Sequence, residues 1–216
     1  MLTSNQPGFV PLLVNGRPLK ALNQFYNKQR AYYQSLLPTG RYTSRRLDIL
    51  TDKRKRQIDS YLHVASRRVV NHLAGRNVGR LIIGKNDGWK QEVTLGKRTN
   101  QAFVFLPHAR FIQMLTYKAR LVGIEVLLTE ESYTSKCSFL DNEPLIQQES
   151  YAGKRTKRGL FVTATGKRLN ADVNGSYNII AKVVPNAFGN GRGGVVVHPV
   201  RLDLTNRSHG RNARVT

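Results

Sequence analysis

The sequence predicts an α/β fold, and three neighbouring segments support this class. The run "GRLIIGKN" (79–86) is typical of a short apolar strand bounded by turn-forming residues, and "IEVLLTE" (124–130) is typical of a second buried strand. Between them the pattern predicts a helix that starts near Pro107 and is closed by Gly123. A crossover of this length connects parallel strands, so the three segments form a βαβ unit.

The helix of this unit is expected to bury one face. That face is formed by Phe111, Leu115, Ala119 and Val122, which recur at helical spacing.

Two more helices are predicted ahead of the first strand, over residues 20–38 and 43–74. In the second, apolar residues recur at spacings of four, three, four and four, with basic residues between them. These apolar residues are Ile58, Leu62, Ala65, Val69 and Leu73. The sequence Pro38-Thr39-Gly40 separates the two helices, and Gly75 is a C-cap candidate. The segment of about 20–75 is therefore a basic helical hairpin.

The two ends of the chain give weaker signals. The opening run "FVPLLVNGRPLKAL" predicts a strand followed by an Asn15-Gly16 turn, and this strand must find its partner elsewhere. Residues 137–168 read as an irregular insertion with one hairpin that turns at Thr165-Gly166, and a helix over 171–184 ends at Pro185. Residues beyond 188 are expected to be mostly unfolded.

The charge of the chain points to a nucleic-acid partner. Thirty-five Lys and Arg against 13 Asp and Glu give a net charge of +22. A solvated surface explains any one basic cluster, but it explains their sum poorly, because few acidic residues are interspersed. Phosphate binding explains the sum. The candidate phosphate contacts are Arg45, Arg46, Lys53, Arg54, Lys55, Arg56, Arg67, Arg68, Lys154, Arg155, Lys157 and Arg158.

The cysteine content and the hydropathy pattern exclude several classes of protein. Cys137 is the one cysteine, which excludes an intramolecular disulfide and a cysteine-based zinc ribbon, so zinc is not expected. The sequence shows neither a secretory signal nor an apolar span of about 18 residues. We therefore expect a cytoplasmic protein without a membrane partner.

Asp172, in "NADVNGSYNI" (170–179), allows three interpretations. Asn170 or Asp172 can be an ordinary helix N-cap. The spacing of Asn170, Asp172, Asn174 and Gly175 resembles the start of an EF-hand loop, but position 12, which should be Glu, is Ala181. The third interpretation is a magnesium site for phosphodiester cleavage, in which oxygen ligands from separate elements hold two ions about 3.5–4 Å apart.

A magnesium site needs partners for Asp172, and the predicted strand at 124–130 offers them. Glu130 and Glu131 stand at its C-terminal end, where open α/β sheets place their sites. Adjacent strand residues point to opposite faces, so at most one of the two faces the metal. A solvated strand end is the alternative for both residues.

Several motifs in order resemble the C-terminal half of TnpB-type (OrfB) transposases of bacterial insertion sequences. They are "GKNDGWKQEVTLGKRTNQAFVFLPHARF", "EESYTSKCSF", "KRGLF", "NADVNGSYNI" and "VVPNAF", and the resemblance runs from about residue 4 to 188. This family is similar to the RuvC-like, RNase H-fold nucleases of type V CRISPR effectors. The resemblance implies an RNase H-like (RuvC) fold and an RNA-guided DNA endonuclease that uses Mg²⁺, DNA and a guide RNA.

The resemblance also implies roles for individual residues. Asp172 matches the last catalytic aspartate of the family. The catalytic glutamate usually follows the strand that matches "RLIIGKN", yet Gly84, Lys85 and Asn86 stand there. The metal-binding glutamate is then expected to be Glu131, or Glu130, at the neighbouring strand end.

The sequence departs from the family pattern in two further respects. The family carries two Cys-x-x-Cys pairs that hold zinc, whereas Cys137 stands without cysteine partners, so the insertion either holds its shape without metal or does not hold it. The first catalytic aspartate belongs to a strand that would precede residue 1. We therefore expect a truncated protein with an N-terminally incomplete fold, which binds nucleic acid weakly and cuts little or nothing.

This interpretation divides the chain into four parts. Residues 1–136 form part of the nuclease domain, with the helical hairpin inserted and the βαβ unit at about 79–130. Residues 137–168 are a Cys-depleted, zinc-ribbon-like insertion, 169–188 carry the last helix, and 189–216 are a disordered basic tail. The main alternative is a non-catalytic nucleic-acid-binding module that regulates a full-length relative. A basic ribosome-associated protein explains the motifs less well.

The other polar residues offer weaker candidates. Asp48, Asp52 and Asp59 lie on the basic hairpin and are expected to form local ion pairs. His63 and His72 face opposite ways on one helix, so they are not a metal pair. Trp89 could stack on a base, although partial burial is the commoner fate of a tryptophan.

Overall fold

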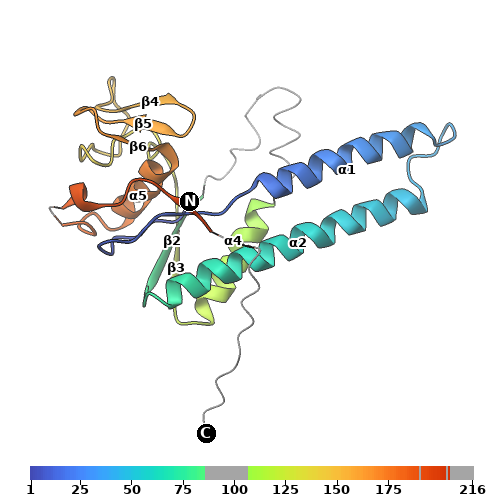
Figure 1. Ribbon diagram of the computed structural model, residues 1–216, viewed down its shortest axis with the longest axis horizontal. Coiled ribbons are helices and arrows are strands. Elements are labelled where there is room, and N and C mark those ends of the chain that lie inside the picture. The colour runs from blue at the N-terminus through green and yellow to red at the C-terminus, as the bar shows by residue number, and fades with distance from the viewer. Residues whose placement is uncertain (86–106, 190, 203, 205–216) are drawn as a thin grey trace, which may run out of the picture.

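The computed structural model describes residues 1–85, 107–189, 191–202 and 204. Its helices are α1 (Arg17–Ser35), α2 (Arg45–Ala74), α4 (His108–Arg120) and α5 (Ala171–Val183), with a short 3₁₀ helix η1 (Arg192–Gly194). Its strands are β1 (Leu12–Leu13), β2 (Arg80–Gly84), β3 (Glu125–Thr129), β4 (Lys154–Lys157), β5 (Leu160–Val162), β6 (Arg168–Asn170) and β7 (Val200–Arg201). Figure 1 shows the hairpin of α1 and α2 projecting to one side of the region that holds the strands.

The predicted βαβ unit is confirmed. β2 and β3 pair in parallel, with Arg80 opposite Glu125 and Gly84 opposite Thr129, and α4 connects them. The core beneath this pair joins α2, β2, α4 and β3. Its buried members are Val69, Val70, Leu73, Leu81, Leu115, Ala119 and Ile124. Because apolar residues from four elements meet there, this core holds the β2–β3 pair in a fixed position against α2 and α4.

The prediction of the buried face of α4 is wrong for one residue. Val122 is 42% exposed, because α4 ends at Arg120 and Gly123, at φ +75°, turns the chain away. Met114 is buried instead, against the base of the hairpin.

The helical hairpin is also confirmed. All five predicted apolar residues of α2 are buried, and Gly75 follows the helix as its C-cap. Leu19 of α1 packs with Ile58 and Leu62 of α2 and with Met114, so the base of the hairpin is fixed to the βαβ unit.

The expectation of a disordered tail over 189–216 is wrong for residues 191–202. β7 pairs in parallel with β1, and the backbone nitrogens of Val200 and Leu202 donate to the carbonyls of Pro11 and Leu13 at 2.9 and 3.0 Å. The opening strand was expected to find its partner elsewhere in the chain, and in the structure β7 is that partner. Residues 203 and 205–216 lie outside the described residues.

The insertion forms a three-stranded antiparallel sheet in the order β4–β5–β6. The predicted hairpin is present as β5 and β6, and Gly166 adopts φ +78° in its turn. β4 was not predicted, because its four polar residues are all exposed and show no alternation. Phe161 and Leu169 are buried with Ala171 at the start of α5, which joins the sheet to that helix.

Candidate cation site and nucleic-acid interface

Asp172 lies in the first turn of α5, but it is not the helix cap. The side-chain oxygen of Asn170 accepts from the backbone nitrogens of Asp172 and Val173 at 2.9 and 3.2 Å, so Asn170 is the cap. The Asp172 carboxylate stays exposed at the positive end of the helix dipole, where negative charge is favoured. Of the two residues that the sequence offered as the cap, Asn170 is therefore the one that fills this role.

Glu131, rather than Glu130, turns inward. Glu131 is half-buried just after β3, whereas Glu130 is exposed. A Cβ atom on Gly84 would lie 2.6 Å from Cγ of Glu131 and 2.7 Å from Cδ1 of Ile179. The Glu131 side chain therefore fills the space at the end of β2 where residue 84 has no side chain, next to α5.

Asp172 and Glu131 both act electrostatically on the amino group of Met1. Burial lowers the pKa of the Met1 α-amino group, and the negative charges of Asp172 and then Glu131 act in the opposite direction. The hydroxyls of Thr3 and Ser176 lie 2.8 Å apart and fix this first segment to α5, one turn after Asp172. Asp172, in the first turn of α5, and Glu131, just after β3, therefore both lie near the first residues of the chain.

Asparagines of α5 hold the loop that carries Glu131. Asn178 donates to the carbonyls of Thr134 and Cys137 at 2.9 and 2.8 Å, and Asn174 donates to Cys137 O at 2.8 Å and accepts from Phe139 N at 2.9 Å. Both amides are fully buried. Thr134 in turn donates to the Glu131 carbonyl, at 2.8 Å from its hydroxyl.

Sequence reasoning missed this role for the asparagines. The available signal was a pair of amides four positions apart in a helix that is otherwise largely apolar. Lys182, four positions further on, extends the same face of α5 and donates to Glu130 O at 3.1 Å and to Ser132 Oγ at 2.9 Å. One face of α5 thus forms hydrogen bonds to the loop that follows β3, while Asp172 and Ser176 lie on another face.

The insertion keeps its shape through hydrogen bonds. The Glu143 carboxylate is buried and accepts from the backbone nitrogens of Ser138 and Ala152 at 2.6 and 2.8 Å, so it ties together two arms of the loop. The Cys137 thiol donates to the carbonyl of Pro144 at 3.3 Å. Burial, followed by the charge of Glu143, raises the pKa of this thiol, which keeps it protonated.

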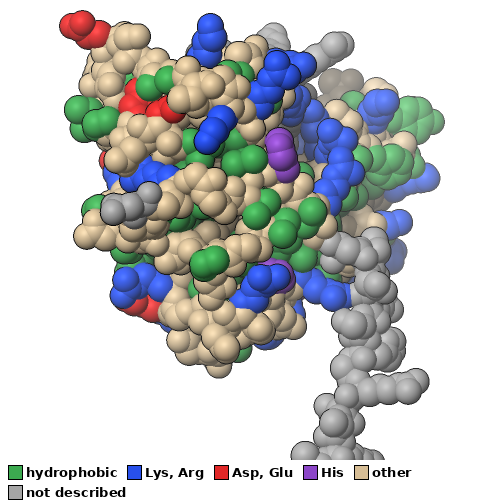
Figure 2. Space-filling model, turned by 60° about the vertical axis from the view of Figure 1, so that its left-hand side comes forward, with side chains coloured by type: hydrophobic (Ala, Val, Ile, Leu, Met, Phe, Trp, Pro, Cys, Tyr) green, Lys and Arg blue, Asp and Glu red, His purple; other side chains and the backbone are tan. Residues whose placement is uncertain are grey.

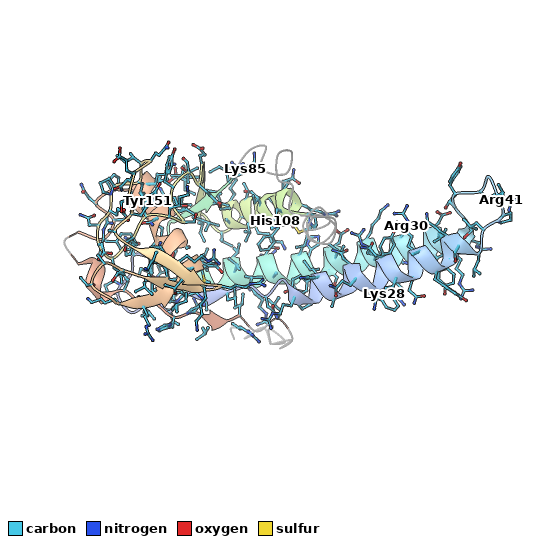
Figure 3. The ribbon with its side chains drawn as sticks, turned by 90° about the horizontal axis from the view of Figure 1, so that it is seen from above. Lys28, Arg30, Arg41, Lys85, His108 and Tyr151 are labelled. Atoms are coloured by element: carbon cyan, nitrogen blue, oxygen red, sulfur yellow. The ribbon has the colours of Figure 1, made fainter. Side chains whose placement is uncertain are left out.

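The predicted phosphate contacts fall on two separate elements. Eight lie on α2, and the others lie on β4 and at Arg158; all are exposed except Arg54 and Arg68, which are half-buried. Arg54 is only half-exposed, because its Nε donates to Asn23 at 2.7 Å and its guanidinium lies 4.8 Å from the ring centre of Tyr26. Lys and Arg outnumber Asp and Glu on the face shown in Figure 2. Figure 3 shows Lys28, Arg30 and Arg41 on the far half of the projecting hairpin.

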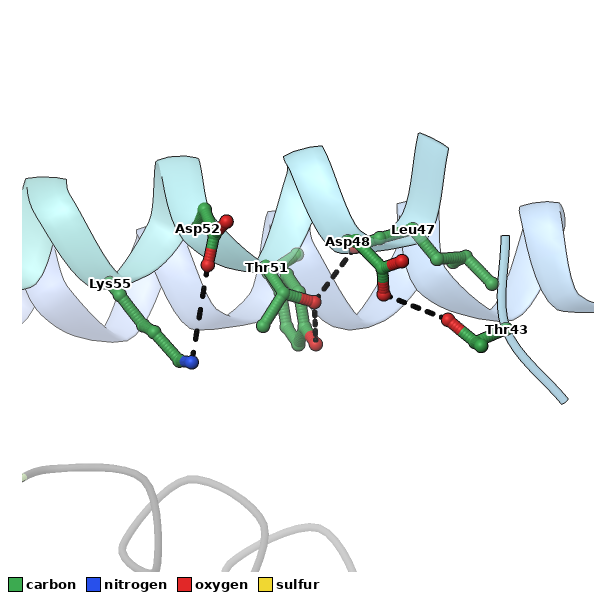
Figure 4. Close-up of polar contacts among 7 residues, drawn as sticks. Thr43, Leu47, Asp48, Thr51, Asp52 and Lys55 are labelled. Atoms are coloured by element: carbon green, nitrogen blue, oxygen red, sulfur yellow. Dashed lines mark hydrogen bonds and ion pairs between the residues drawn. The ribbon is translucent and has the colours of Figure 1, made fainter. Parts of the chain in front are cut away.

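The acidic residues of the hairpin have three different partners. Asp52 forms the expected local ion pair with Lys55, at 4.0 Å between exposed groups (Figure 4). Asp48 instead accepts from the Thr43 hydroxyl at 2.8 Å, ahead of the helix. Asp59 pairs with Arg110 of α4 at 2.9 Å, so this ion pair connects two helices rather than neighbours on one. An exposed pair such as Asp52 and Lys55 contributes about 0–1 kcal/mol.

His63 and His72 have different neighbours. The Lys118 ammonium donates to the His63 carbonyl at 2.8 Å. The rings of His72 and Phe9 meet edge to face, with centres 5.6 Å apart. Among the described residues, no three His, Cys, Asp or Glu side chains gather closely enough to hold a metal ion. Trp89 lies outside the described residues. None of the described helices is long and apolar enough to cross a membrane.

Comparison with known families agrees with the order of these motifs along the chain. Residues 4–90 match the family described as OrfB_IS605, probable transposase, and residues 108–179 match the Cas12f1-like TNB domain. The chain belongs to the TnpB-type transposase family. The first match covers the hairpin and β2, and the second covers α4, β3, the insertion and most of α5, including Glu131 and Asp172.

Two similar proteins support this membership. A TnpB-like protein of Acidianus two-tailed virus is 26% identical over 206 residues, which is 90% of this chain and 40% of that protein. The Cas12f1 chain in a cryo-EM structure of a Cas12f1–sgRNA–target DNA complex matches with a TM-score of 0.55 and 19% identity, over 76% of this chain and 42% of that chain. The mixed α/β architecture is therefore Cas12f1-like, and the chain spans about two-fifths of the length of each of these proteins.

Proposed function

We propose that this TnpB-type chain forms the cation-binding part of an RNA-guided DNA endonuclease, with Asp172 and Glu131 as ligands of Mg²⁺. The observation that carries the proposal is that Glu131 turns inward at the end of β2, where Gly84 leaves room for it, beside α5, whose first turn presents the exposed carboxylate of Asp172. The two carboxylates come from separate elements, as ligands of a nuclease site do.

The chemistry of the two side chains fits Mg²⁺. This ion takes oxygen ligands, keeps several waters, and is commonly held by one or two carboxylates together with phosphate oxygens of the substrate. Bound there, Mg²⁺ would polarise a phosphodiester and activate a water. The chain itself orients the ligands: α5 presents Asp172 at its positive end, and the loop held by Asn178 presents Glu131.

The basic surfaces support DNA and a guide RNA as partners, by analogy with the Cas12f1 complex. The exposed cations lie on two different elements, α2 and β4. The cations of one element can follow the phosphate backbone of one strand, while those of the other element contact a second strand. We assign phosphate contacts to the predicted basic residues except Arg54, which is engaged inside the hairpin. A cytoplasmic location suits these partners.

Paramagnetic broadening of amide resonances by Mn²⁺ tests the cation site and detects weak binding. In the unmodified chain, we expect broadening centred on residues 131–134 and 172–176. Asp172→Asn and Glu131→Gln should each abolish it, whereas Glu130→Gln, a matched change one residue away, should leave it intact. Equal effects of Glu130→Gln and Glu131→Gln would contradict the assignment.

A non-catalytic binding module, acting beside a full-length relative, is the second candidate, and the net charge of +22 favours it. A nuclease assay with Mg²⁺ separates the two functions by comparing the unmodified chain with Asp172→Ala. Cleavage that depends on Asp172 supports the endonuclease. Equal activity of both proteins, with nucleic-acid binding that weakens steeply as salt rises, supports the module.

A further inference from the structure

A stripe of large exposed side chains runs along the outer face of α1. Phe25 and Tyr32 are each 58% exposed, and Leu36, directly after the helix, is 63% exposed. They are spaced by seven and four positions, so they lie on one side of the helix. The face that packs on α2 is a different one and contains Leu19 and Tyr26, which are buried. We refer to Phe25, Lys28, Tyr32 and Leu36 as the α1 stripe.

The charge of α1 indicates what kind of partner fits this stripe. The helix has no acidic residue, and it carries Arg17, Lys20, Lys28 and Arg30. Lys28 lies three positions after Phe25 and four before Tyr32, so an ammonium stands beside two exposed rings. A second copy of this helix would bring the same positive charge to the interface, whereas a polyanion would be attracted to it.

The far end of the stripe is held in place before any partner binds. The rings of Tyr32 and Tyr33 meet edge to face, with centres 5.3 Å apart, and the guanidinium of Arg46 lies 4.3 Å from the ring centre of Tyr33. Arg46 belongs to α2, so this contact ties the two helices together near the tip. An aromatic group that is already oriented loses less side-chain entropy on binding.

We propose that the α1 stripe is a stacking platform for unpaired nucleobases of a single-stranded nucleic acid. Rings that alternate with cations bind single strands, because each base offers a flat face for stacking and each phosphate offers a charge. In a duplex the base faces are covered by neighbouring base pairs, so a duplex cannot use the rings in this way. The inference rests on the proposed binding of nucleic acid and is independent of the cation site.

Fluorescence titration of the whole chain tests the platform. The probes are a single-stranded oligoadenylate RNA that contains 2-aminopurine and a duplex of the same length. The double variant Phe25→Ala/Tyr32→Ala should bind the single strand at least about fivefold more weakly and lose quenching of 2-aminopurine, with little change for the duplex. The slope of log affinity against log salt should stay unchanged, since no charge is removed, whereas Lys28→Ala should reduce it by about one.

Two controls separate stacking from a general loss of structure. Ile49→Ala removes an apolar side chain that is 56% exposed on α2, and it should bind both probes like the unmodified chain. Tyr32→Phe keeps the ring and should retain the quenching.

Three results would overturn the proposal. Unchanged single-strand binding by the double variant would remove the platform while leaving nucleic-acid binding in place. Absence of binding by the unmodified chain would remove both. If the double variant instead abolished self-association in light scattering and left RNA affinity intact, the stripe would be a contact between two copies of the chain.

Discussion

The side chain of Glu131 occupies the space next to Gly84 that a side chain on residue 84 would need. Gly84→Ala should therefore displace Glu131 and the nearby Ile179, at a cost of about 1–3 kcal/mol for the forced repacking. We expect Mn²⁺ broadening around residue 131 to weaken more than broadening around residue 172. Gly79→Ala is the control, since a Cβ there meets nothing within 4 Å. Normal broadening in Gly84→Ala would show that Glu131 is not needed at this place.

Asn178→Ala should loosen the loop that carries Glu131. The change removes two hydrogen bonds of a fully buried amide and leaves the carbonyl of Thr134 without this donor, so we expect a loss of about 2–3 kcal/mol in the free energy of unfolding. Hydrogen exchange at residues 131–137 should speed up. Asn5→Ala removes an exposed bond to Ala187 O and should change stability by about 0.5 kcal/mol or less. Equal protection of the loop from hydrogen exchange in Asn178→Ala and in the unmodified chain would show that Asn178 does not hold the loop.

Glu143→Gln tests whether a carboxylate holds the insertion together. Glutamine keeps one acceptor but turns an NH₂ group toward a backbone N–H, so we expect a loss of about 2–3 kcal/mol, measured by urea unfolding. Glu149→Gln, at an exposed position, should leave the unfolding curve unchanged. Addition of EDTA should not alter the stability of the unmodified chain. A large effect of EDTA that persists in Asp172→Asn, which lacks a proposed Mg²⁺ ligand, would show that the insertion depends on a metal.

Because of His72, the fold should be less stable in mild acid than at neutral pH. Burial, followed by the charge of Arg76, lowers the pKa of His72, so between this lowered value and the ordinary value of about 6.5 the unfolded chain binds more protons than the folded one. Stability should therefore fall as the pH drops below about 6.5, with a lower Tm at pH 5 than at pH 7.5. His72→Phe should reduce the difference in Tm, whereas His198→Phe, at an exposed position, should keep it. An unchanged pH dependence in His72→Phe would assign the effect to other groups.

The elements with a regular apolar period were predictable from the sequence. The five apolar residues of α2 followed directly from their spacing, and the two short strands around α4 followed from apolar runs, the first of them bounded by turn-forming residues. The positions of Asp172 at the start of a helix and of Glu131 after a strand were also predictable, from the apolar runs that bound these elements.

What could not be predicted depends on contacts between distant segments. The opening strand was predicted, but its pairing with β7 was not, because β1 and β7 are only two residues long and neither shows a period. Lys118 is 3% exposed on α4, although its charge predicts a surface position, because its ammonium reaches His63 O at 2.8 Å and Ser66 Oγ at 2.6 Å. Spacing alone also cannot show that Asn170, rather than Asp172, is the cap, since either residue suits that position.

The pairing of Leu12 and Leu13 with Val200 and Arg201 has a consequence for synthesis on the ribosome. β1 is made long before its parallel partner β7, so the two strands can pair only after all the elements between them have emerged. A protein tag or deletion that disturbs residues 191–202 should therefore damage the packing at the beginning of the chain, including the segment that lies beside Asp172.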